Sequence, residues 1–182
     1  LYISPDGAHM ENLIDLGIAC RDFSLRYYKQ CFYMVDSMNL AYSFRIRKSR
    51  NLIDWEEKFY TVCDRAEKNL WAPDLYIDDD GSAYIYFGGG VPNGQQNNPK
   101  TARVAKLGED MISIDGEAKE IDAPCMFEDS GIFKYGDKYY YSYCSNFISP
   151  HKNGYPGYGT ICYMVSDDPM GPFTYAGEVF EN

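Results

Sequence analysis

Three stretches of the chain share one layout, and each begins with an acidic residue about fifty residues after the previous one. These acids are Asp22, Asp74 and Glu128. In each stretch a short apolar strand follows the acid, then a polar turn, then a strand rich in aromatic residues. A repeat of this length that is built from strands is typical of propeller blades stacked around an axis. We therefore expect the three acids to occupy equivalent places and to face one central pocket.

The strands and turns predict an all-β fold, because short strands alternate with turn signals and hardly any segment has helical periodicity. We expect one partial β-propeller domain over residues 1–182, with blades at approximately 22–60, 71–121 and 127–180. Closed propellers have about four to eight blades, so three blades form an incomplete ring. We expect the missing blades in a longer parent chain, or self-association of a second copy with the open blade edges.

The charge of the chain disfavours two classes of partner. With a formal net charge of −10 the chain repels nucleic-acid phosphates and anionic lipids. The sequence contains no run of about 18 apolar residues, so it predicts no membrane-spanning helix. A neutral polysaccharide fits better, and the 18 tyrosines suit both sugar stacking and packing within strands.

The six cysteines form no CxxC pair, and they lie mostly in expected strands. We expect free thiols that behave as small apolar groups, without a disulfide framework. The chain opens at Leu1 with no recognisable signal peptide, so the native N-terminus is expected elsewhere. The sequence leaves the localisation open between extracellular and cytoplasmic.

Four segments carry a family resemblance. Residues 127–134 read FEDSGIFK and residues 139–146 read YYYSYCSN, while residues 71–74 read WAPD and residues 87–92 read FGGGVP. The chain resembles glycoside hydrolase family 43, the five-bladed propellers that cleave arabinose and xylose linkages in plant cell walls. The resemblance is strong from about residue 71 to residue 182 and weaker before that.

The resemblance implies two principal catalytic residues. Glu128 is expected to be the general acid, because it follows the apolar Met126 and Phe127 and stands beside Asp129. Asp22 is expected to be the general base that activates water on the opposite face of the sugar. Phe23 stands where the family has proline, and a salt bridge with a neighbouring arginine is the alternative role for Asp22.

The third acid of the family, which tunes the general acid and holds substrate, has two alternatives. Asp74 is the candidate from the repeat, and it lies two residues after Ala72 on the same strand face. In the family's own register the place of this acid falls on Ala72, just before Pro73. Either Asp74 serves or the third acid is absent.

Three further residues are candidates for substrate binding. Trp71 and Phe127 flank the expected acids and can stack on a sugar, with core packing as the alternative, while Asn146 can bond a hydroxyl group. The triple aspartate before Gly81 is expected to form a hairpin turn, because it lacks the other ligands of a calcium loop. We expect no required cofactor. The resemblance implies a structural metal ion such as calcium, whose ligands would lie outside this chain.

The expected function is hydrolysis of α-L-arabinofuranosyl or β-D-xylosyl linkages in arabinoxylan or xylan, with inversion at the anomeric carbon. The expected partner is a plant cell-wall polysaccharide or oligosaccharide. One alternative is a propeller that binds glycan, or only folds, without turnover. A second is a retaining, fructosidase-like propeller whose first Asp is a nucleophile, and the distance between the two carboxyl groups separates retention from inversion.

Overall fold

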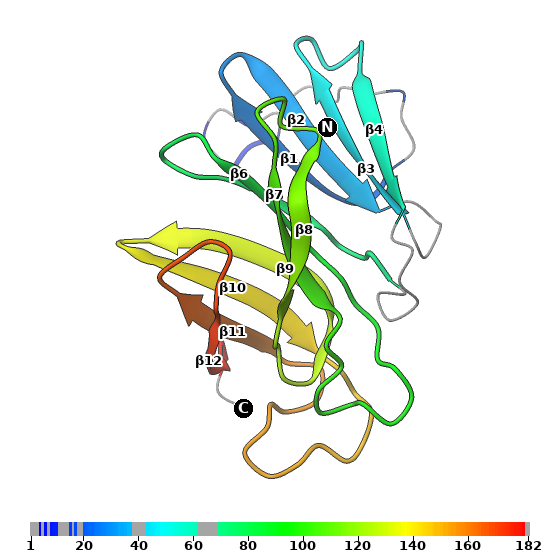
Figure 1. Ribbon diagram of the computed structural model, residues 1–182, viewed down its shortest axis with the longest axis vertical. Helices are drawn as coiled ribbons and strands as arrows, with labels where there is room; N and C mark the ends of the chain where they lie inside the picture. The colour runs from blue at the N-terminus through cyan, green and yellow to red at the C-terminus, as the bar shows by residue number, and fades with distance from the viewer. Residues whose placement is uncertain are drawn as a thin grey trace.

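The computed structural model describes residues 20–37, 43–61 and 69–180, together with residues 4, 6, 8–10, 15 and 17. These residues form twelve strands in three antiparallel sheets of four strands each (Figure 1). In each sheet the strands follow chain order, so neighbours along the chain pair by hairpins. The prediction of an all-β propeller of the five-bladed type with about three blades is confirmed.

Blade one contains the strands of the first sheet, which are β1 (Arg21–Tyr28), β2 (Cys31–Ser37), β3 (Ser43–Ser49) and β4 (Glu56–Thr61). Blade two contains β5 (Asp74–Ile77), β6 (Ala83–Phe87), β7 (Ala102–Leu107) and β8 (Ile114–Ile121). Blade three contains β9 (Met126–Tyr135), β10 (Lys138–Ser145), β11 (Ile161–Ser166) and β12 (Thr174–Glu178). The first strand of each blade is the inner one, because β5 packs beside both β1 and β9.

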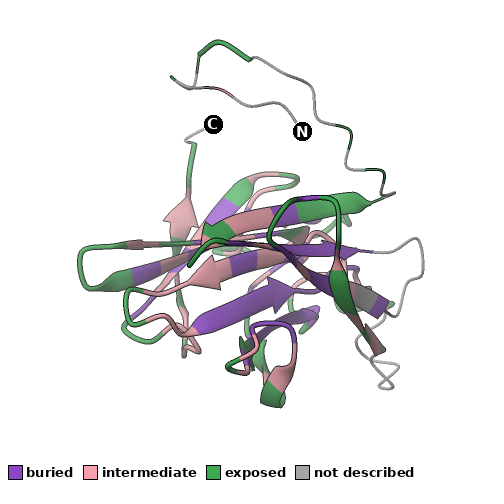
Figure 2. Ribbon diagram, turned by 90° about the horizontal axis from the view of Figure 1, so that it is seen from above, coloured by how far each residue is buried: buried purple, intermediate pink, exposed green. Residues whose placement is uncertain are grey.

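Two apolar cores hold the blades together. Alternate residues of β2 and β6, among them Val35 and Ile85, form the first core between blades one and two. The second core lies between blades two and three and is built on tyrosines, with the rings of Tyr86 and Tyr141 stacked 5.9 Å apart. The side chains point to opposite faces along each strand, and every residue of β6 is buried between the two neighbouring blades. Figure 2 shows in purple the buried residues along the strands. Tyr86 and Tyr141 therefore serve the packing of the second core.

Polar contacts add to these cores at the outer ends of the blades. The turn between β5 and β6 begins at Asp78, which accepts hydrogen bonds from Tyr139 and from Lys134 of blade three. Lys134 also contacts Asp79 at 2.8 Å. The triple aspartate thus makes the expected hairpin turn and, in addition, docks blade two onto blade three.

Blade one contains a buried ion cluster. Asp36 is fully buried between two arginines, with Arg45 at 2.9 Å and Arg47 at 3.0 Å. Arg47 in turn contacts Glu57 at 3.0 Å. Because a buried charge is tolerated only when it is paired, this cluster fixes the pairing of β2, β3 and β4.

The five cysteines in the described part of the chain, Cys20, Cys31, Cys125, Cys144 and Cys162, are all free thiols. No helix in that part is long and apolar enough to cross a membrane.

Candidate active site

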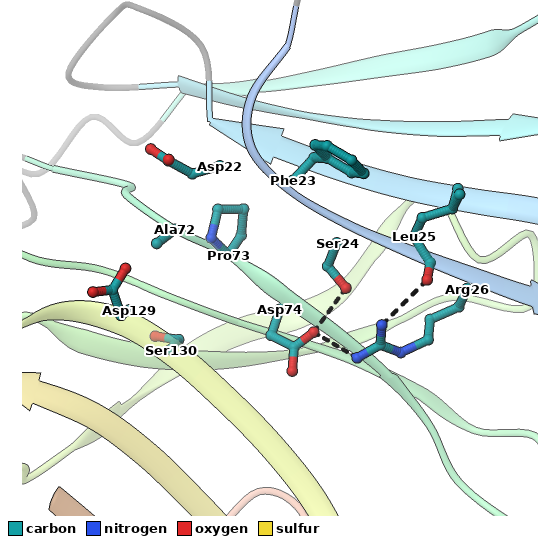
Figure 3. A pocket seen from close by; sticks show the side chains of 10 residues that line it. All are labelled: Asp22, Phe23, Ser24, Leu25, Arg26, Ala72, Pro73, Asp74, Asp129 and Ser130. Atoms are coloured by element: carbon teal, nitrogen blue, oxygen red, sulfur yellow. Dashed lines mark hydrogen bonds and ion pairs between the residues drawn. The ribbon is translucent and has the colours of Figure 1, made fainter. Parts of the chain in front are cut away.

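A cavity of about 510 Å³ lies where the inner strands of the three blades meet (Figure 3). It is lined by residues 22–26 of β1, residues 72–74 at the start of β5, and residues 129–130 of β9. Three of the lining residues are aspartates, namely Asp22, Asp74 and Asp129. The repeat thus brings acids from all three blades to one cavity, although Asp129 and not Glu128 is the lining acid of blade three.

Each blade places one residue with left-handed backbone beside this cavity. The φ angles are 45° at Asp22, 37° at Ala72 and 67° at Asp129. The pairing of β1 with β2 shifts register at Asp22, and the pairing of β9 with β10 shifts between Glu128 and Gly131. Such bulges turn a side chain away from the regular alternation, and strained residues of this kind cluster at functional sites. The structural equivalents are therefore Asp22, Ala72 and Asp129.

Asp22 is accessible from the cavity, with 47% of its side chain exposed. Its Oδ2 accepts a hydrogen bond of 3.3 Å from Ser37, and the guanidinium of Arg21 lies 3.6 Å away. The ion pair with Arg21 is loose and open to solvent, so it leaves the carboxylate able to contact a water molecule or a substrate. Arg26, four residues further along β1, pairs with Asp74 instead.

Glu128 lies next to these acids on β9, in a half-buried position. Burial raises the pKa of its carboxyl group, and the negative charges of Asp129 and Asp22 raise it further, while Arg21 opposes them. The pKa of Asp129 is also raised, first by burial and then by the charge of Asp22. These three carboxyl groups are therefore close enough to influence one another, and Glu128 is held toward its protonated form.

Asp74 differs from the other acids because both of its oxygens are engaged. Oδ1 accepts hydrogen bonds of 2.7 Å from Ser24 and from Arg26, and Oδ2 accepts one of 3.0 Å from the backbone N–H of Ile132. Only 13% of its side chain is exposed. The charges that raise the pKa of Glu128 come from Asp129 and Asp22 rather than from Asp74.

The two candidate stacking residues form one aromatic cluster beside Glu128. The rings of Trp71 and Phe127 meet edge to face at 6.0 Å, and Phe147 contacts Phe127 at 5.0 Å. Phe147 is 61% exposed, so the cluster is open to solvent at this residue. Gly89 lies directly behind it, because a Cβ at this glycine would meet Phe127 O at 2.8 Å and Trp71 Cε3 at 3.1 Å.

Asn146 is fully buried and belongs to the scaffold. Its Nδ2 donates to the carbonyls of Gln96 and Cys125, and its Oδ1 accepts from the N–H of Ile148. The ring of His151 lies 3.0 Å from the same Oδ1. The amide has no polar atom left for a sugar hydroxyl, so this arrangement gives the predicted substrate contact at Asn146 no support.

Within the described residues, no group of three or more His, Cys, Asp or Glu side chains could hold a metal ion.

No family model matches the chain, but curated relatives do. An arabinoxylan arabinofuranohydrolase from Paenibacillus polymyxa is 58% identical over 117 residues, which are 62% of this chain and 18% of the relative. An arabinoxylan arabinofuranohydrolase from Bacillus subtilis strain 168 is 56% identical over 119 residues, which are 62% of this chain and 23% of the relative. The chain thus spans about a fifth of the length of these curated relatives.

The solved structures agree. A glycoside hydrolase family 43 arabinoxylan arabinofuranohydrolase from Bacillus subtilis, in complex with cellotetraose, superposes with a TM-score of 0.81 at 41% sequence identity. The match covers 90% of this chain and 37% of that one. This chain is a partial glycoside hydrolase family 43 propeller. The resemblance read from residues 71–146 is therefore confirmed.

Two features of this family 43 site were not predicted from the sequence. Asp129 was read only as a neighbour of Glu128, although aspartate is one of the few residues that readily adopts a left-handed backbone. Ser24 and Arg26 carried no signal, because their role depends on contact with Asp74, which is 50 and 48 residues away in the sequence.

Proposed function

We propose that this partial family 43 propeller hydrolyses α-L-arabinofuranosyl or β-D-xylosyl linkages of arabinoxylan-type polysaccharides, with inversion at the anomeric carbon. The single observation that carries the proposal is the coupling of Glu128 to Asp22 and Asp129 beside the cavity. A general acid must stay protonated near neutral pH, and burial together with two neighbouring negative charges shifts the pKa of Glu128 upward, in the direction this role needs.

The proposed reaction divides the work between two carboxyl groups. Asp22, exposed to the cavity, takes a proton from water as the water attacks the anomeric carbon. Glu128 gives its proton to the departing glycosidic oxygen, so that bond breaks without forming an alkoxide. Inversion requires room for this water between the two groups, and a cavity of about 510 Å³ holds a pentose and a water molecule.

The aromatic cluster of Trp71, Phe127 and Phe147 is the proposed stacking platform for the sugar. It lies directly beside Glu128 and exposes the ring of Phe147. Aromatic rings bind the apolar faces of sugars and add little conformational entropy cost, since they are already packed against one another. Arabinofuranosyl is the favoured sugar, because the two curated relatives reported above are named arabinofuranohydrolases.

The test is the release of 4-nitrophenol from the α-L-arabinofuranoside and the β-D-xyloside, and of pentose from arabinoxylan, by the chain and by Glu128→Gln and Asp22→Asn. We expect Asp22→Asn to lose turnover on all substrates, because no base remains. Glu128→Gln should lose more on arabinoxylan than on the nitrophenyl glycosides, whose leaving group needs less protonation. NMR of the first anomer released then reports inversion or retention.

The pH profile provides a second test. Activity requires protonated Glu128, so it is lost as pH rises through the pKa of this residue, which lies above the ordinary value for glutamate. An unmutated chain that binds arabinoxylan and releases no sugar would refute the proposal and favour a glycan-binding role.

A further inference from the structure

The Asp74 carboxylate connects the inner strands of all three blades. From β5 it reaches Ser24 and Arg26 on β1 through Oδ1 (Figure 3). Its Oδ2 reaches Ile132 on β9. Ser24 also accepts a hydrogen bond of 3.2 Å from the N–H of Leu75, next to Asp74. Among the described strands, backbone pairing stays within each blade, so this carboxylate is a direct polar link between blades at the cavity.

The partners of Asp74 stand close in sequence to both proposed catalytic residues. Ser24 is two residues after Asp22 on β1, and Ile132 is four residues after Glu128 on β9. The link therefore crosses from the strand that carries the base to the strand that carries the acid. A change in this link alters the relative position of those strands at the cavity.

The bonding of Asp74 does not suit an acid or a base. Its oxygens face an arginine, a hydroxyl group and a backbone N–H, and the side chain is largely buried. Three donors occupy most of the acceptor sites of this carboxylate, so few are left for a substrate or a water molecule.

We propose that Asp74 is a positioning residue that fixes β1 against β9 and so sets the separation of Asp22 and Glu128. This inference rests on the proposed function. An inverting glycosidase needs a fixed gap between its two carboxyl groups, with room for one water molecule. Asp22 also sits at a bulge with a left-handed backbone, a conformation that persists only where the surroundings hold it firmly.

The consequence is a rate effect without loss of the acid or the base. A misplacement of about 1 Å at a reacting group can cost roughly a hundredfold in rate. We therefore expect variants that cut the link to lower kcat by about tenfold to a hundredfold, with a smaller change in KM.

The experiment compares Asp74→Asn, Ser24→Ala and the double variant on the 4-nitrophenyl arabinofuranoside. Asparagine has the shape of aspartate, but its NH₂ group cannot accept a hydrogen bond from Ile132 or Arg26. Ser24→Ala removes one of the two β1 contacts of Asp74, leaves the contact with Arg26, and changes no charge. Asp137→Asn, in an exposed turn of blade three, is the matched control for the lost charge and should keep full kcat.

If Asp74 acts by positioning, both single variants lose kcat and the double variant loses no more than the worse of them. Full kcat in Ser24→Ala beside a loss in Asp74→Asn would show that the contact of Asp74 with β1 through Ser24 does not set the rate, and would overturn the inference. Full kcat in both would also overturn it and leave a purely structural role. Circular dichroism confirms the fold of each variant, and if Asp74→Asn fails to fold, Ser24→Ala alone decides.

The two proposals fail in different ways. An unmutated chain without turnover refutes the proposed function and this inference with it. An active unmutated chain whose rate is insensitive to both single variants refutes only the positioning role of Asp74.

Discussion

Asp22, Ala72 and Asp129 have a left-handed backbone beside the cavity. Ala72 is the only one of the three without a carboxyl group, which makes Ala72→Asp an informative change. The residue lines the cavity between Asp22 and Asp129, and its φ of 37° is costly for alanine. Aspartate adopts this backbone more readily, since its short polar side chain can bond locally. The change therefore adds a negative charge at the cavity on a backbone already suited to it.

The size of the electrostatic effect follows from the dimensions of the cavity. A sphere of 510 Å³ is about 10 Å across, and two unit charges at that distance interact by roughly 1.7 kcal/mol at an effective dielectric constant of about 20. Since one pKa unit corresponds to about 1.4 kcal/mol, and salt screens part of the interaction, the pKa of Glu128 should rise by about one unit.

The assay is the pH dependence of kcat on the arabinofuranoside substrate at constant ionic strength. Glu128 must be protonated to act, so a higher pKa moves the alkaline limb of the profile upward by about one pH unit. Ala72→Asn is the matched control, because it has nearly the same shape without the charge, and its alkaline limb should stay where it is in the unmutated chain.

Two results would refute this reasoning. An unchanged alkaline limb in Ala72→Asp would mean that position 72 does not act on the proton of Glu128. An equal shift in Ala72→Asp and Ala72→Asn would mean that shape, and not charge, is responsible.

Three further changes test the scaffold of the site. Gly89→Ala should lower kcat by roughly tenfold or more with the fold retained, because its Cβ would meet Phe127 O at 2.8 Å and displace the strand of Glu128; unchanged kinetics would mean that the loop yields instead. Asp36→Asn should lower the free energy of unfolding by about 3–5 kcal/mol in urea denaturation, since the buried Arg47 and the half-buried Arg45 both lose a buried charged partner. A loss below about 0.5 kcal/mol, the size expected for an exposed site, would contradict that account. Asn146→Ala should cost about 1–3 kcal/mol of stability with KM unchanged; a raised KM at full stability would restore its predicted contact with sugar.

The blades could be read from the sequence because their signals are local. Alternating apolar residues, aromatic strands and Gly- or Asp-containing turns determine each hairpin within a few residues. The turn at Asp78 was predicted for that reason. Its contacts with Lys134 and Tyr139 could not be, since those partners lie more than fifty residues away in another blade.

The register of the acids was the part that the repeat could not provide. Counting from the aromatic strands makes Asp22, Asp74 and Glu128 equivalent, yet the backbone makes Asp22, Ala72 and Asp129 equivalent. A bulge adds one residue to a strand, and a shift of one residue moves a side chain to the other face. The alternative that the family's third acid falls on Ala72 agrees with the observed backbone.

Hydrogen-bond donors separate the acids of the scaffold from the acids proposed for chemistry. Asp36 and Asp74 each face arginine, and Asp78 is bonded by Tyr139 and Lys134, so hydrogen-bond donors hold these carboxylates in place. Within the described part of the chain, the structure gives Glu128 no hydrogen-bond donor, and its neighbours Asp22 and Asp129 are themselves acids. A sequence cannot show this difference, because it depends on which donors the fold brings to each carboxyl group. The same acidic residue type thus holds blades together where donors surround it and can carry a proton where they do not.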